Sequence, residues 1–152
     1  MLIPFFAGIF IIAILDQAAK LFAAGLLPSV KTIPLIEDVF HLTYVENTGA
    51  GFGVFADYTW LLTAMTLIII IFVVSYVVVK KPKNRVLITA LIFMMGGAVG
   101  NMIDRVRLGY VIDFFDFTLI DFPVFNVADC FITVGAVIFA VYVIFFSEKK
   151  EN

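Results

Sequence analysis

The chain contains four long apolar stretches, and they leave it few ways to fold. They cover residues 5–26, 60–79, 86–103 and 127–146, and each is close to the roughly 20 residues that a helix needs to cross the hydrocarbon core of a bilayer. With 63% hydrophobic and 14% charged residues, a soluble globule of this length would leave too much apolar surface in water. The sequence therefore predicts an all-α polytopic membrane protein, built as a single membrane domain with four transmembrane helices.

Lysine and arginine indicate the orientation, because they are enriched in short cytoplasmic loops. Four cations and no anion occupy residues 80–85, and Lys149 and Lys150 follow the fourth stretch. The other side of the membrane receives an acidic balance of side chains. We expect both termini to lie in the cytoplasm. No Lys or Arg precedes the first stretch, which itself contains Asp16 and Lys20, so we interpret it as a retained helix rather than a cleaved signal.

Two segments are expected on the outer face. Residues 27–58 are too polar to span the membrane, and Phe40 to Val45 alternate in the manner of a strand before a run of glycines. This first segment predicts a small β-sheet on the outer surface. The second segment, residues 105–126, is rich in Phe and Asp, and we expect it to be a loop that lies partly in the membrane interface.

Ionisable residues inside apolar helices are costly, so each one is a candidate for function. Asp16 and Lys20 are four residues apart and share a helix face; they form either an internal ion pair or a support for a nearby site. Asn101, Asp104 and Arg105 form one polar face at the outer end of the third stretch, where Arg105 could equally cap the helix by reaching the interface.

The fourth stretch opens on a second polar pair. Asn126 is followed three residues later by Asp129, which is the spacing of a helix cap. The outer ends of three predicted helices thus carry carboxylates at a similar depth, and Asp113 and Asp116 lie in the neighbouring loop. We expect several acids to converge at the outer membrane boundary.

Neighbouring carboxylates in a poorly hydrated site suit acid–base hydrolysis, because two close anions cannot both ionise cheaply. His41 is the only histidine and Cys130 the only cysteine, so no nucleophilic triad is indicated, and no ligand spacing predicts a metal or another cofactor. Position alone does not identify the pair of acids. A small transporter or channel with Asp16, Lys20 and Asp104 as an ion or proton relay is an alternative, and a non-catalytic assembly factor is a third; nothing indicates nucleic-acid binding.

Five motifs in order resemble those of lipoprotein signal peptidase, also called signal peptidase II. They extend over nearly the whole chain, and together they are far more specific than any one of them. The motifs read Asp16-x-x-x-Lys20, Asn47-Thr48-Gly49-Ala50-Gly51-Phe52, Gly97-x-x-Gly100-Asn101-x-x-Asp104-Arg105, Gly109-x-Val111-x-Asp113-Phe114 and Phe125-Asn126-x-Ala128-Asp129.

The resemblance implies an aspartyl protease with a catalytic dyad of Asp113 and Asp129. Its substrate would be a prolipoprotein whose cysteine already carries diacylglycerol, cleaved just before that cysteine, by an enzyme that we expect to act as a monomer among membrane lipids without a cofactor. The resemblance also implies supporting roles for other polar residues and glycines, which are Asp16, Asn47, Gly49, Asn101, Asp104, Arg105 and Asn126; Lys20 joins them as the partner of Asp16.

Two positions depart from the family pattern. Cys130 stands where serine is usual, and Gly51 where alanine is common; both replacements are small, and we interpret Cys130 as a packing residue. If Asn126 caps the fourth helix, the helix dipole favours the carboxylate form of Asp129. Our hypothesis is that Asp113 carries the proton that the two acids share.

Overall fold

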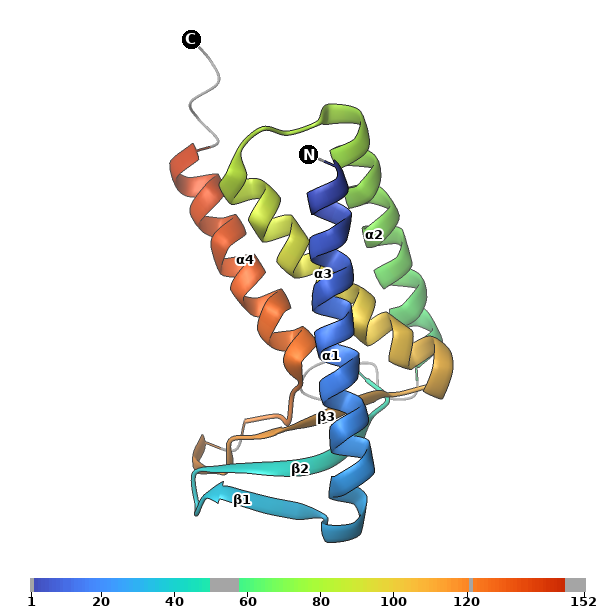
Figure 1. Ribbon diagram of the computed structural model, residues 1–152, viewed down its shortest axis with the longest axis vertical. Coiled ribbons are helices and arrows are strands. Elements are labelled where there is room, and N and C mark those ends of the chain that lie inside the picture. Colours follow the sequence, from blue (N-terminus) through green and yellow to red (C-terminus); the bar gives the residue numbers. More distant parts are fainter. Residues whose placement is uncertain (1, 50–57, 121, 147–152) are drawn as a thin grey trace.

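Four long helices and one small sheet make up the computed structural model, which describes residues 2–49, 58–120 and 122–146 (Figure 1). All four helices are long and apolar enough to cross a membrane, which confirms the predicted helices. Gly51 and the other residues of the run 50–57 lie outside the described residues. In chain order the elements are α1 (Leu2–Val30), β1 (Thr32–Ile36), β2 (Phe40–Asn47), α2 (Thr59–Lys80), α3 (Arg85–Leu108), β3 (Val111–Asp116), a 3-10 turn η2 (Thr118–Ile120) and α4 (Val127–Phe146).

The ends of α3 and α4 are fixed by local hydrogen bonds. Asn84 caps α3 by accepting from the backbone of the first turn. At the other end Gly109 adopts φ +83° and donates its N–H to the carbonyl of Arg105. The helix α3 thus continues through Leu108, beyond the membrane span predicted for residues 86–103, and it includes Arg105.

Glycines allow α3 to pack closely against its neighbours. A Cβ on Gly97 would overlap the backbone of α4, and one on Gly100 would lie 2.5 Å from a carboxylate oxygen of Asp16 on α1. Gly135 of α4 is in close contact with the backbone of α3 in the same way. Lipid tails are as apolar as the surfaces of the helices, so membrane helices associate through close packing, which small residues permit. The polar residues of α1, α3 and α4 are thereby held within hydrogen-bonding distance.

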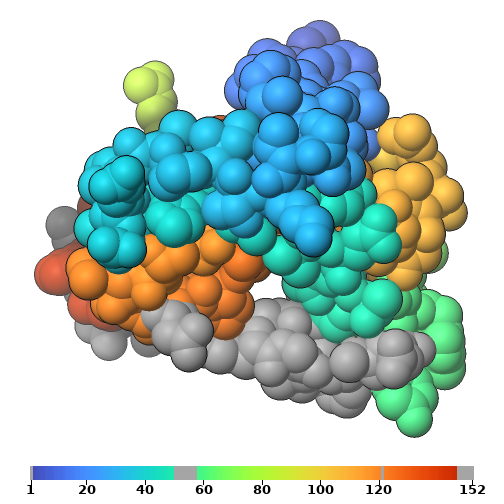
Figure 2. Space-filling model, turned by 90° about the horizontal axis from the view of Figure 1, so that it is seen from below, coloured from blue at the N-terminus to red at the C-terminus, as the bar shows by residue number. Residues whose placement is uncertain are grey.

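The sheet lies across one end of the helices, here called the sheet end (Figure 1). It is antiparallel in the order β1-β2-β3, and β3 comes from the segment predicted as an interfacial loop. The sheet predicted within residues 27–58 is confirmed, and the second outer segment supplies its third strand. Seen from the sheet end, β1 and β2 extend away from the nearby ends of α2 and α3 (Figure 2).

Packing holds β3 against the helices. Ile112 and Phe114 of β3 form a buried cluster with Ala23 and Leu27 of α1. On its other side, Phe115 pairs with Phe125 just before α4. Because side chains alternate along a strand, Asp113 faces away from the apolar cluster. The strand therefore presents this aspartate to the ends of α3 and α4.

Candidate active site

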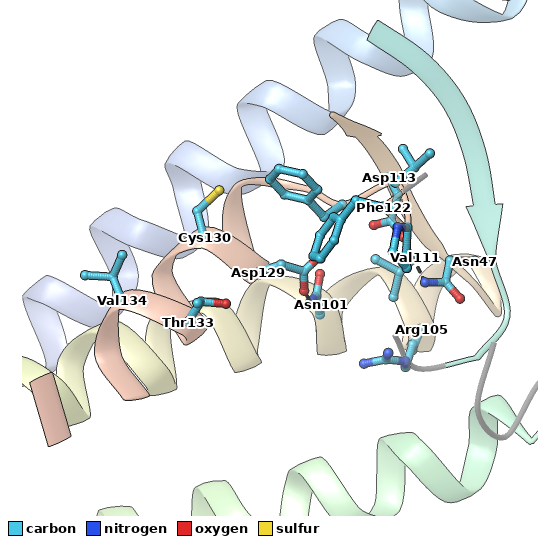
Figure 3. A pocket seen from close by; sticks show the side chains of 13 residues that line it. Asn47, Asn101, Arg105, Val111, Asp113, Phe122, Asp129, Cys130, Thr133 and Val134 are labelled. Atoms are coloured by element: carbon cyan, nitrogen blue, oxygen red, sulfur yellow. Dashed lines mark hydrogen bonds between the residues drawn. The ribbon is translucent and has the colours of Figure 1, made fainter. Parts of the chain in front are cut away.

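A cavity of about 510 Å³ opens at the sheet end, between β2, β3, α3 and α4 (Figure 3). One part of its lining is polar and comprises Asn47, Asn101, Arg105, Asp113 and Asp129. The other part is largely apolar and comprises Val111, Phe122, Pro123, Val124, Phe125, Cys130, Thr133 and Val134. The cavity therefore offers a polar group of side chains beside a surface that suits hydrocarbon.

Asp113 is 1% exposed, and each of its carboxylate oxygens accepts a hydrogen bond from an amide. Asn126 Nδ2 donates to one oxygen at 2.6 Å and Asn47 Nδ2 to the other at 2.8 Å. Burial raises the pKa of Asp113 to about 6; the Asn47 hydrogen bond opposes this rise, and the charge of Asp129 adds to it. A carboxyl with this pKa keeps its proton in weakly acidic solution, where an exposed aspartate is already ionised.

Asp129 lies in the first turn of α4. Its Oδ1 accepts from Asn101 Nδ2 at 2.8 Å, and its Oδ2 accepts from the backbone N–H of Asn126 at 3.1 Å. In return the Asn126 side chain accepts from the backbone N–H of Asp129, so the predicted cap is present as a reciprocal pair. Asn126 thus contacts both acids, through its side-chain amide to Asp113 and through its backbone to Asp129.

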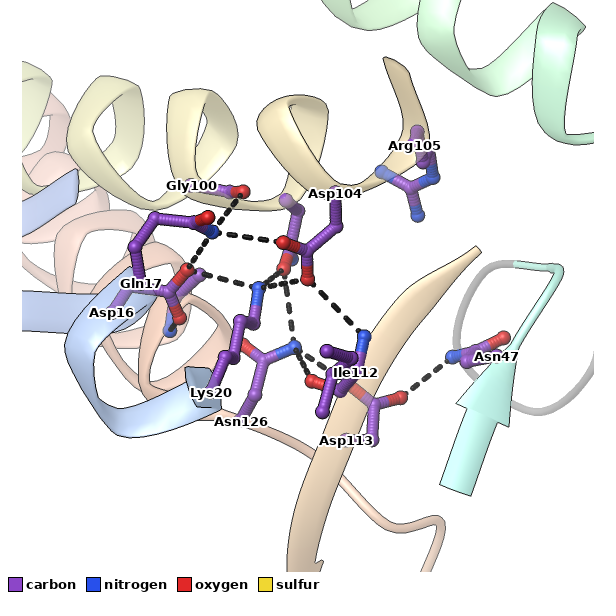
Figure 4. Close-up of polar contacts among 12 residues, drawn as sticks. Asp16, Gln17, Lys20, Asn47, Gly100, Asp104, Arg105, Ile112, Asp113 and Asn126 are labelled. Carbon is purple, nitrogen blue, oxygen red and sulfur yellow. Dashed lines mark hydrogen bonds and ion pairs between the residues drawn. The ribbon is translucent and has the colours of Figure 1, made fainter. Parts of the chain in front are cut away.

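Lys20 lies behind this pair, 1% exposed, and has three acceptors (Figure 4). Its Nζ is 2.9 Å from Asp16, 3.0 Å from Asp104 and 2.7 Å from Asn101 Oδ1. Because a lysine ammonium has three donors, all of them are used. The contact to Asn101 Oδ1 turns the amide group so that its Nδ2 faces Asp129.

The two carboxylates that pair with Lys20 also bind backbone groups. Asp16 Oδ1 accepts from the N–H of Ala128 at 2.8 Å, which joins α1 to the start of α4. Asp104 Oδ2 accepts from the N–H of Ile112 at 3.2 Å, which joins α3 to β3 beside Asp113. The buried ion pairs therefore fix the positions of the two elements that carry Asp113 and Asp129.

Arg105 lines the cavity (Figure 3) and lies apart from the ion pairs of Lys20 (Figure 4). One guanidinium nitrogen donates to the carbonyl of Gly49 at 3.2 Å, and the N–H of Gly49 donates to Asn47 Oδ1 at 2.9 Å. Within the described part of the chain, its buried Nε has no hydrogen-bond partner. The side chain lines the cavity, which favours the site role of Arg105 over the alternative of a cap at the interface.

Gln17 is a further member of the network, and it was not predicted from the sequence. Its Nε2 donates to Asp104 Oδ1 at 2.8 Å and to the carbonyl of Gly100 at 3.2 Å. Its Oε1 accepts from Arg107 at 3.4 Å. A polar, uncharged side chain inside an apolar stretch was the available signal, since such groups form hydrogen bonds between membrane helices.

The structure brings together every residue that the sequence analysis selected for the site. Cys130 is half-buried on the apolar wall of the cavity. The described residues include no cluster of side chains suited to hold a metal ion. Among these residues, His41 lies in β2 and does not line the cavity. The chemistry that the lining supports is acid–base catalysis by two carboxyl groups.

Comparisons with known proteins agree with this geometry. The family model described as signal peptidase (SPase) II matches residues 8–145. A lipoprotein signal peptidase of Clostridioides difficile is 44% identical over 90% of this chain and 92% of its own length. Another, of Caldanaerobacter subterraneus, is 47% identical over 88% of this chain and 91% of its own. A bacterial membrane enzyme solved by the in meso method at 2.3 Å resolution superposes with a TM-score of 0.84, at 26% identity over 98% of this chain and 92% of that one.

Proposed function

Because the chain belongs to the signal peptidase II family, we propose that Asp113 and Asp129 are the carboxyl groups with which it hydrolyses the peptide bond of a prolipoprotein. The chain is a multi-pass membrane protease of the lipoprotein signal peptidase type. The alternative of a transporter or channel is not supported by these relatives. The assignment rests on one observation: Asn126 forms hydrogen bonds with both acids, which line the same cavity.

The two acids divide the reaction between them. Asp113, whose pKa is raised to about 6, holds the proton and donates a hydrogen bond to the oxygen of the scissile carbonyl. Asp129 is the carboxylate that takes a proton from the attacking water, favoured in this form by the N-terminus of α4. When the tetrahedral intermediate collapses, the C–N bond breaks and the leaving amine takes a proton from the pair.

The supporting residues position this pair rather than react. Lys20 orients Asn101, which donates to Asp129, and Asn47 donates to Asp113. We propose the same positioning role for Gln17, since its contact with Asp104 helps to hold the carboxylate that binds the backbone of β3. A Gln17→Met variant keeps the length of the side chain and removes its donor. It should therefore lower kcat with little change in KM. Gln17→Glu keeps a polar side chain but has no N–H to donate, so it should lower kcat by an equal amount.

The two parts of the cavity lining, one polar and one apolar, suit the peptide and the acyl chains of such a substrate. We propose that the peptide reaches the polar part, while the acyl chains on the modified cysteine lie along the apolar wall near Val134 and in the surrounding lipid. All of the residues assigned a role belong to one chain, so we propose that a monomer is sufficient for activity. The bond cleaved would be the one before the lipid-modified cysteine.

Orientation follows from the cations. Residues 80–85, with four cations and no anion, lie at the opposite end of the helices from the sheet (Figure 1). By the preference of cations for cytoplasmic loops, we propose that both termini are cytoplasmic and that the cavity opens at the outer face of the inner membrane. A reporter active only in the cytoplasm should be active when it is fused to the C-terminus and inactive when it is inserted at residue 38.

The decisive experiment is a gel-shift assay in detergent micelles with a diacylglyceryl-modified prolipoprotein. Asp113→Asn and Asp129→Asn should each abolish loss of the signal peptide. Asp38→Asn is the matched control, because it removes an exposed acid from the turn between β1 and β2, and it should leave cleavage intact. Substantial cleavage by either dyad variant would overturn the assignment.

A further inference from the structure

A second pocket lies at the end of the helices opposite the sheet. It has a volume of about 770 Å³ and is formed by the end of α2, the link to α3 and the end of α4. In Figure 1 this link arches over the upper ends of the helices. Three lysines line the pocket, Lys80, Lys81 and Lys83, together with the aromatic residues Tyr76 and Tyr142. None of these residues takes part in the candidate active site.

The charge of this pocket is uncompensated within the described residues. Among them, the only salt bridges are those that Lys20 makes at the other end of the helices, so no carboxylate pairs with the three lysines. Beyond residue 146 the sequence adds Glu148 and Glu151 together with two further lysines, so these four side chains bring no net charge. The pocket is therefore suited to an anion.

The floor of the pocket is apolar and firmly packed. Leu87 is 4% exposed and belongs to a buried cluster with Phe5 and Val77, against which Tyr142 packs. The backbone of the link is held by Asn84, which caps α3, and by Lys81, whose N–H donates to the carbonyl of Val77. Cations at the rim and hydrocarbon at the floor are thus fixed relative to one another at the ends of membrane helices.

We propose that this pocket binds the headgroup of an anionic phospholipid. Its phosphate would lie between Lys80 and Lys83, and its acyl chains would run along α2, of which only 6% of the apolar window is buried inside the protein. Basic pockets between membrane helices suit such headgroups, and tyrosines favour the same depth. A free phosphate would satisfy the lysines but would leave the apolar floor uncovered, which favours a whole lipid. With the orientation proposed above, the lipid belongs to the inner leaflet.

Native mass spectrometry of the purified protein tests this proposal. The protein in detergent is titrated with phosphatidylglycerol and with phosphatidylcholine that carries the same acyl chains. At about fivefold in affinity for each lysine near the surface, the double variant Lys80→Gln/Lys83→Gln should bind phosphatidylglycerol about 25-fold more weakly than wild type. The variant should still cleave prolipoprotein, which shows that it is folded.

Arg85→Gln is the matched control, because Arg85 is exposed in the same link but does not line the pocket. It should change the affinity by no more than about fivefold, since it removes one charge near the surface but no side chain that lines the pocket. Equal binding of the two lipids, or a loss in Arg85→Gln as large as in the double variant, would overturn the pocket in favour of diffuse surface charge. Displacement of the lipid by millimolar inorganic phosphate would overturn the assignment to a whole lipid.

Discussion

Replacing Asp113 with asparagine is expected to change how the stability of the protein depends on pH. Burial raises the pKa of this carboxyl from 3.8 to about 6, and at about 1.36 kcal/mol per pKa unit the rise corresponds to about 3 kcal/mol. The folded state binds this proton more tightly than the unfolded state, so the contribution of Asp113 to stability is greatest below pH 3.8 and falls as the pH rises through about 6. Asparagine does not titrate. Relative to wild type, Asp113→Asn should therefore gain most of this energy, about 2.4 kcal/mol, between pH 4 and pH 7.

This gain is separable from the other effects of the substitution. Both neighbouring amides donate to Asp113, so the new amide group of asparagine faces one donor and loses a hydrogen bond worth about 1–3 kcal/mol. That loss is the same at every pH. The titration of the carboxyl is therefore measured by how the difference in unfolding free energy between variant and wild type changes with pH.

Thermal unfolding followed by circular dichroism measures the effect across pH 4 to 7 in detergent. At about 2–4 °C per kcal/mol, the Tm of Asp113→Asn should rise by about 5–10 °C relative to wild type over this range. Asp38→Asn removes an exposed carboxyl and should follow the wild-type profile. Parallel profiles for wild type and Asp113→Asn would refute the argument that burial keeps this carboxyl protonated near pH 6.

Three further predictions concern the helices. Lys20→Met should lower the free energy of unfolding by about 3–5 kcal/mol, because two buried carboxylates lose their cation. The control Lys31→Met removes an exposed lysine and should change this free energy by less than about 0.5 kcal/mol. Chemical denaturation measures both variants. Gly97→Ala should lower the Tm because its Cβ overlaps the backbone of α4, whereas Gly25→Ala, with nothing within 4 Å, should raise it slightly. Cys130→Ser should keep the cleavage rate within about twofold of wild type, since among the described residues no hydrogen bond joins the thiol to Asp113 or Asp129.

The helices could be predicted from the sequence because lipid imposes one length and one composition on each of them. Their ends could not. The end of α3 depends on Gly109, whose φ of +83° becomes evident only when the next strand is placed. The third strand was missed for a similar reason: Val111 pairs with Asn47, which is 64 positions earlier in the chain, and no local pattern encodes that register.

The sequence predicted which residues form the candidate site, but not which of them contact one another. The spacing of Asp16 and Lys20 placed both on one helix face, and the ion pair between them is confirmed. That Lys20 also contacts Asn101, and through it Asp129, depends on the packing of α1 against α3. Gln17 carries no charge, so the cost of burying an ionisable group did not point to it.

The polar residues around the cavity fall into two classes that stability and activity measurements together can separate. Lys20 contributes to both fold and site, because it holds two carboxylates and orients Asn101; its removal should therefore lower stability and cleavage together. A buried carboxyl such as Asp113 opposes folding above its pKa, so its removal should lower cleavage while it relieves a pH-dependent destabilisation. A variant at position 113 that lost cleavage and also lost stability more steeply as the pH rose would place Asp113 with the positioning residues instead.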